Sequence, residues 1–152
     1  MNFILSIVSG IISGVISSII VSYYFMKITD EQRNKENIRN NKNEIISYIS
    51  LLEFEIRTYL SYYNQEEREQ SLKTIKRIVS THSLFEKEFS SKDLNNEFLR
   101  IRNKILIYLV DMNNELLMRD YGEKVDREYF IEKNKKLWDL HLELRRIDIF
   151  YK

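Results

Sequence analysis

The residue types that most often carry chemistry in proteins are sparse in this chain. Its 152 residues include two histidines, His82 and His141, and no cysteine. Thiol nucleophiles, disulfides and cysteine-based metal sites are therefore excluded. A two-metal site in a helical bundle needs two Glu-x-x-His motifs, but Val79 and Trp138 stand three positions before the two histidines. We expect a solvated His82, a half-buried His141, and no bound metal or cofactor.

Recognised catalytic motifs are missing as well. The chain has three glycines and contains no G-x-x-x-x-G-K-[ST] loop, no G-x-G-x-x-G and no G-x-S-x-G. Its acidic residues mostly stand three or four positions from a Lys or Arg, as they do on solvated helix faces. We therefore predict that the protein is not an enzyme.

Basic side chains gather at several places in a chain whose net charge is only +1. Lys73, Lys76 and Arg77 share one helical face, which is the predicted site for an anionic ligand such as a nucleotide or oligonucleotide. Other clusters are Arg100, Arg102 and Lys104, and then Lys133, Lys135, Lys136, Arg145 and Arg146. Acidic residues are interleaved throughout, so the favoured interpretation is a charge-balanced, solvated surface.

The first 26 residues contain no charged side chain, and their apolar run from Phe3 to Met26 is 24 residues long. As a helix this run would measure about 36 Å, against a hydrocarbon core of about 30 Å. Tyr23 and Tyr24 suit the headgroup boundary, and five Lys or Arg follow between residues 27 and 42. We expect a single-pass transmembrane helix over residues 1–26 in a bacterial inner membrane, with its N-terminus outside and the remaining chain cytoplasmic.

Two other interpretations of this run are weaker. A cleaved signal peptide would need a basic start and an A-x-A-like site, and neither is present. A buried helix in a globular domain is rarely apolar on all sides over such a length.

Small residues follow one face of the expected span. At 100° per residue this face collects Ser6, Ser9, Gly10, Ser13, Gly14 and Ser17. Small residues let helix backbones approach closely, and serine can hydrogen-bond across the contact. The face predicts a homo-oligomer, and in a sharper form a pore lined by serine hydroxyls. An incidental enrichment in Ser and Gly is the third possibility.

The rest of the chain has the periodicity of a helical bundle. Residues 27–44 are polar and predict a juxtamembrane stalk, in which Thr29 and Gln32 could cap a new helix. Residues 45–152 predict an antiparallel bundle of three long helices and one short one. Its repeats step by four and three in two rows: Ile45, Ile49, Leu52, Ile56, Tyr59, Tyr63, and Leu94, Phe98, Ile101, Ile105, Tyr108, Met112. Predicted helix boundaries are Ser83, Ser90, Asp93, Gly122 and Asp126.

This layout resembles small membrane proteins of bacterial phage-defence loci of the abortive-infection type. The resemblance follows the order of short span, polar DEQRNKENIRNNKNE stalk and EIISYISLLEFEI helix. The class of proteins that the chain resembles includes the channel effector of the Hailong system. No functional residue is carried over from that class. The resemblance implies a self-associating membrane effector, expected to be an oligomeric pore gated by its helical domain through a regulatory protein or anionic ligand. The alternative is a non-conducting membrane scaffold or adaptor, or a holin or immunity-type protein, whose bundle recruits a partner.

Overall fold

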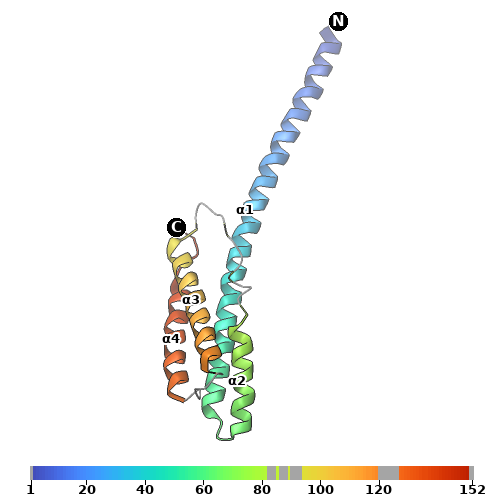
Figure 1. Cartoon of the computed structure of the whole chain (residues 1–152). Coiled ribbons are helices and arrows are strands. Elements are labelled where there is room, and N and C mark those ends of the chain that lie inside the picture. Colours follow the sequence, from blue (N-terminus) through green and yellow to red (C-terminus); the bar gives the residue numbers. More distant parts are fainter. Residues whose placement is uncertain (1, 82–84, 86–88, 90–93, 120–126, 151–152) are drawn as a thin grey trace. The chain divides into compact units, whose positions relative to one another are not determined.

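The computed structural model describes residues 2–81, 85, 89, 94–119 and 127–150, with the backbone alone for residues 2–13 and Arg119. Four helices make up its regular structure: α1 (Asn2–Ser61), α2 (Gln65–Val79), α3 (Asn96–Arg119) and α4 (Arg127–Arg146) (Figure 1). The chain divides into two compact units, Met1–Asn37 and Ile38–Lys152, and α1 contributes to both. The predicted all-helical fold is confirmed.

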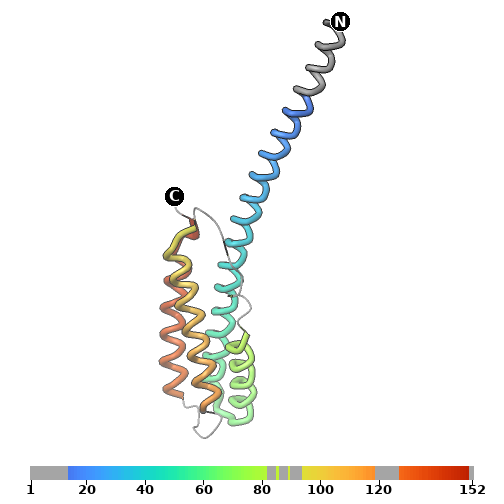
Figure 2. The backbone as a smooth tube through the Cα atoms, turned by 45° about the horizontal axis from the view of Figure 1, so that its top comes forward, coloured from blue at the N-terminus to red at the C-terminus, as the bar shows by residue number. Residues whose placement is uncertain are grey.

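The second unit is a four-helix bundle built from α2, α3, α4 and the part of α1 that starts at Ile38. Figures 1 and 2 show these helices side by side, with consecutive helices running in opposite directions. Both predicted apolar rows lie in the core, except that Tyr63 is exposed. The core begins at Ile38, earlier than the predicted start at Ile45. A seam that repeats every 3.5 residues keeps one face of each helix turned inward, which is why the pattern specifies the packing.

Hydrogen bonds from side-chain hydroxyls to backbone carbonyls link neighbouring helices of the bundle. The Tyr48 hydroxyl on α1 donates to the carbonyl of Ile78 on α2. The Ser71 hydroxyl on α2 donates to the carbonyl of Glu55 on α1 at 3.3 Å. Between α3 and α4, the Tyr108 hydroxyl donates to the carbonyl of Lys133 at 2.7 Å. These hydrogen bonds hold the three side chains at the helix interfaces, because a hydroxyl that is buried without a hydrogen bond lowers the stability of the fold.

Asparagine side chains begin two of the helices. The Asn64 side-chain oxygen accepts from the Glu66 backbone N–H at 3.0 Å, and Asn95 accepts in the same way from Glu97 at 2.9 Å. Each contact satisfies one of the unpaired N–H groups at a helix N-terminus. Helix α3 thus begins after Asn95. The boundaries predicted at Ser83, Ser90, Asp93, Gly122 and Asp126 lie outside the described residues.

The first unit is helical along residues 2–37, including the start of the predicted stalk. Thr29 does not begin a new helix, because its hydroxyl donates back to the Phe25 carbonyl at 2.8 Å within the same helix. This pattern is the usual way for a threonine inside a helix to satisfy its hydroxyl. The stretch expected to break therefore continues the α1 helix.

The predicted transmembrane helix requires a correction. Within the residues that the structure describes, no helix is long and apolar enough to cross a membrane. The single-pass inner-membrane location, with the N-terminus outside and a cytoplasmic C-terminal domain, is therefore not supported. Residues 3–13, which form the first part of the expected span, lie outside the described side chains.

The reason lies in where the charges begin on α1. Among the side chains that the structure describes, the uncharged stretch of α1 runs from Gly14 to Met26, which is about 20 Å of helix at 1.5 Å per residue. A hydrocarbon core of about 30 Å needs roughly 20 apolar residues. Lys27, Asp30 and Glu31 follow on the same unbroken helix, so they dilute the apolar character of a window that is extended beyond Met26.

Two isoleucines on α3 test the packing of the core. Ile105 is 0% exposed, whereas Ile107, two positions later, is 61% exposed. Replacing Ile105 by alanine removes a packed side chain and leaves a cavity, so Ile105→Ala is expected to lower the free energy of unfolding by about 2–5 kcal/mol. Ile107→Ala is the matched control and should cost less than about 1 kcal/mol. Urea denaturation measures both, and equal costs would contradict the described register of α3.

Tyr48 makes the bundle sensitive to alkali. Burial raises the pKa of its hydroxyl to about 12, whereas an unfolded tyrosine titrates near 10. The folded state therefore holds a proton that the unfolded state loses, and the free energy of unfolding falls as the pH rises from about 10 to 12. Tyr48→Phe should cost about 1 kcal/mol at neutral pH and show a shallower alkaline decline. Denaturant titrations at pH 7 to 11.5 would measure both effects, and parallel declines would contradict this origin.

Candidate functional site

A buried carboxylate and imidazole meet in the second unit, between α1 and α4. The Nδ1 atom of His141 lies 3.1 Å from Oε1 of Glu53, and the two residues are 3% and 4% exposed. His141 was expected to be half-buried, and it is buried more deeply than that. The Trp138 ring covers it edge-on, with 5.9 Å between ring centroids, and the Arg57 guanidinium lies over Trp138 at 5.5 Å.

A Glu–His pair is part of the machinery of nucleophilic catalysis, but it is not sufficient for it. The imidazole must contact both a nucleophile and a substrate. His141 Nε2 is buried and has no hydrogen-bond partner within the described part of the chain. No group of three or more His, Cys, Asp or Glu side chains there could hold a metal ion. The geometry is that of a structural contact between two helices.

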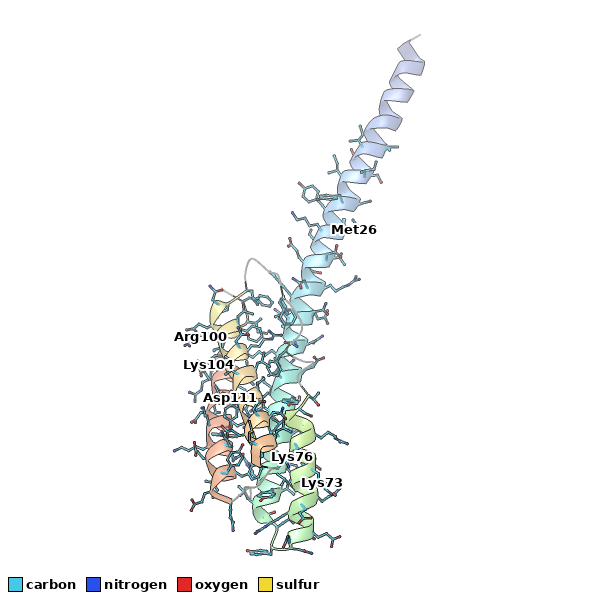
Figure 3. The ribbon with its side chains drawn as sticks, in the orientation of Figure 1. Met26, Lys73, Lys76, Arg100, Lys104 and Asp111 are labelled. Atoms are coloured by element: carbon cyan, nitrogen blue, oxygen red, sulfur yellow. The ribbon has the colours of Figure 1, made fainter. Side chains whose placement is uncertain are left out.

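The predicted anion-binding face lies on α2. Lys73 and Arg77 are exposed, and Lys76 is half-buried. Lys73 and Lys76 are labelled on α2 in Figure 3. Helix α2 ends at Val79, so these cations stand near the helix C-terminus, where positive charge is favourable. The helix C-terminus therefore explains the presence of Lys76 and Arg77 without a bound ligand. The anionic ligand of this face stays a prediction.

The cluster predicted around Arg100 divides in two. Arg100 and Lys104 point outward on α3 (Figure 3) and contact the same carboxylate, that of Glu143 on α4, at 3.6 and 3.8 Å. Arg102 turns into the core, where it donates to the Phe85 carbonyl at 2.7 Å and lies over the Phe89 ring at 5.3 Å. Burial lowers the pKa of the Arg102 guanidinium. Its neighbours at positions 98, 101 and 105 are all buried, which was the signal for an inward direction.

A groove that the sequence did not suggest lies at the C-terminal end of α4. Its volume is about 580 Å³, and its lining includes Arg39 and Lys42 from α1, Arg145 from α4, and the segment 147–150 that follows α4. Lys42 Nζ donates to the carbonyls of Ile147 at 2.6 Å and Arg145 at 3.5 Å. A cation is favourable at these carbonyls because they form the negative end of the α4 helix.

The position of Lys42 at these carbonyls also changes the pKa of its ammonium group. Burial lowers the pKa of its ammonium group, and the carboxylate of Asp148 partly opposes that effect. The segment it holds is fixed from the other side by Asn95, whose backbone N–H donates to the Ile149 carbonyl at 2.8 Å and whose side chain donates to the Asp148 carbonyl at 2.9 Å. The floor of the groove is thus attached to both α1 and the start of α3.

The predicted oligomerisation face lies in the first unit and is described only in part. Ser6, Ser9, Gly10 and Ser13 lie outside the described side chains, while Gly14 and Ser17 are exposed. A Cβ atom built on Gly14 would meet nothing within 4 Å. The described part of the chain therefore does not itself require a glycine there.

Large apolar side chains surround this small face. Between Val15 and Ile28, ten of them are at least half exposed. Met26, labelled in Figure 3, is one of them. At 100° per residue they occupy most of the circumference of the helix. On ordinary protein surfaces exposed apolar residues are scattered singly, whereas a contiguous apolar surface of this kind is typical of an interaction site.

Comparisons with family models, curated proteins and solved structures give no significant match. The resemblance to phage-defence effectors therefore stays a prediction from layout.

The buried pair between α1 and α4 should behave as one unit. Glu53→Leu or His141→Leu alone leaves a buried polar group without its partner and should cost about 1–3 kcal/mol. The double variant replaces both by apolar groups, so its cost should fall below the sum of the single costs by about 1 kcal/mol or more. A double-mutant cycle in urea measures this difference. Additive costs would show that the contact does not couple the two helices.

Proposed function

We propose that this protein is a self-associating assembly protein, in which the apolar part of α1 between Gly14 and Ile28 packs against the same segment of other copies and so brings their helical bundles together. The observation that carries the proposal is the group of ten large, exposed apolar side chains in this segment. Burying one such side chain contributes about 1.5–3 kcal/mol, so a few copies of the segment would supply ample binding energy.

A second copy of the chain is the partner that the segment fits best. Gly14, Ser18 and Ser22 follow each other at steps of four, so their small side chains lie on one face where another backbone can approach. The polar stretch 27–37 carries three basic and three acidic side chains, namely Lys27, Arg33, Lys35, Asp30, Glu31 and Glu36. The stretch therefore has no net charge, so bringing copies of it together causes no net repulsion.

The distribution of apolar side chains also bears on the number of copies. A helix that pairs with one partner needs a single apolar stripe. Here apolar side chains are exposed over most of the circumference, so a dimer would leave many of them in water. The proposal is therefore an assembly of three or more chains.

A pore would need a membrane span, which the structure does not support, whereas self-association needs only the exposed apolar surface. The proposal accordingly contains no pore. Recruitment of a partner by the bundle stays the alternative, and exposed Leu51 and Phe54 on α1 are the side chains that would favour it.

The test uses two apolar residues of equal exposure. Ile19 in the first unit and Phe54 in the bundle are each 63% exposed. Ile19→Glu places a charge inside the proposed interface and should weaken assembly at least tenfold, since a lost apolar contact of 1.4 kcal/mol or more is tenfold in affinity. Phe54→Glu should leave assembly unchanged. Sedimentation velocity of the 152-residue chain over a concentration series measures both.

Three outcomes would overturn the proposal. The first is a wild-type chain that stays monomeric at every concentration. The second is an equal loss of assembly in Ile19→Glu and Phe54→Glu, which would place the contact elsewhere. The third is a monomer that floats with vesicles of neutral lipid, because the apolar surface would then have another occupant.

A further inference from the structure

The groove at the end of α4 contains two exposed guanidinium groups, those of Arg39 and Arg145. Lys42 serves the structure, since it holds the carbonyls of Arg145 and Ile147. Arg39 lies over the Phe150 ring at 5.6 Å, and both Arg39 and Arg145 are exposed. Neither guanidinium forms an ion pair within the part of the chain that the structure describes. Arg145 also stands in the last turn of α4, where a cation is favourable, and Arg39 uses its charge on the Phe150 ring. Neither position occupies the guanidinium group in an ion pair, so both groups can contact an anion.

The charge of the groove is one-sided. Its lining includes three cations, from Arg39, Lys42 and Arg145, and one carboxylate, from Asp148. The neighbouring depression of about 320 Å³ between α3 and α4 has Arg100 and Arg146 but also three acidic residues, Glu97, Asp139 and Glu143. The neighbouring depression therefore lacks the positive excess of the first groove.

The remaining lining is apolar. Ile46 from α1, together with Ile147, Ile149 and Phe150 from the C-terminal segment, provides it. All four are half-buried and pack against the core. A volume of about 580 Å³ lies within the range of small-molecule sites, which is roughly 300–1,000 Å³. Such sites combine an apolar lining with a few polar groups that fix the orientation of the ligand.

We propose that this groove binds an organic phosphate monoester, with the phosphate between Arg39 and Arg145 and the organic group against Ile46 and Phe150. A guanidinium fork binds phosphate through two parallel hydrogen bonds, so two forks from α1 and α4 suit a phosphate group well. The phosphate dianion balances the excess of two positive charges among the lining residues. Lys42 remains on the α4 carbonyls and contributes its charge without a direct contact.

The experiment is a calorimetric titration of the 152-residue chain with phenyl phosphate, inorganic phosphate and benzoate. Phenyl phosphate should bind at least tenfold more tightly than either of the others, because inorganic phosphate lacks the ring and benzoate lacks the second charge. Arg39→Gln and Arg145→Gln should each weaken its binding about tenfold or more. Arg39→Lys keeps the charge and loses the fork, so its affinity should fall between those of wild type and Arg39→Gln.

The control is an Arg127→Gln and Lys135→Gln double variant, which removes two exposed charges from the first half of α4. Its affinity for phenyl phosphate should stay within about twofold of wild type. Thermal unfolding of every variant should match wild type, since the altered side chains are exposed. No binding of phenyl phosphate at millimolar concentration would overturn the proposal. Equal weakening by the control variant, or equal affinity for inorganic phosphate, would also do so.

Discussion

The apolar seam of α1 from Ile38 to Tyr59 is the surface on which the bundle depends. Helix α2 is fixed to it through the Tyr48 and Ser71 hydrogen bonds. Helix α4 contacts it where the Tyr59 and Phe130 rings lie 4.5 Å apart and where Glu53 meets His141. Since such a seam has to stay aligned over several turns, the helix that bears it can hold no break, and the chain contains no proline.

The same seam explains how the C-terminal end of the chain is positioned. Lys42 stands on α1 next to the buried Asn41 and reaches the carbonyls beyond the last turn of α4. Asn95 fixes the next residues while its side chain also begins α3. One cation and one amide thus join three helices at this end of the bundle. These contacts fix the segment after α4 that, with Arg39 and Arg145, lines the groove.

Local periodicity predicted most of the bundle, and contacts between distant residues could not be predicted in that way. The row from Phe98 to Leu116 on α3 is buried as expected, because steps of four and three residues are visible in a short window. The groove joins Arg39 to Arg145, which stand far apart in the sequence, and no pattern along the chain relates them. The prediction grouped Arg102 with its basic neighbours by residue type. Its spacing from the buried row of α3 places it on the inward face of the helix, where the structure shows it.

The membrane span was predicted from the length of the apolar run and from the residues that flank it, and the structure does not support it. The prediction treated residues 1–26 as separate from the polar stretch that follows. In the structure residues 2–26 and that stretch belong to one helix, and Lys27, Asp30 and Glu31 follow its apolar part. A window of hydropathy cannot tell whether a helix stops at its first charge. The continuity of α1 could therefore be learned only from the fold.

Helix α1 combines two kinds of apolar surface, and this difference carries the functional argument. From Ile38 onward its buried apolar residues follow one stripe that the other helices of the chain cover, while Leu51 and Phe54 stay exposed outside it. Between Val15 and Ile28 apolar residues surround the helix, and within the described residues nothing of the chain covers them. Folding buries the first surface. The second surface is buried only when the protein associates with another molecule, so the free energy gained by burying it depends on the binding partner. Gly14 belongs to this second surface and has open space around its Cα, whereas a glycine required for folding would have a close neighbour there.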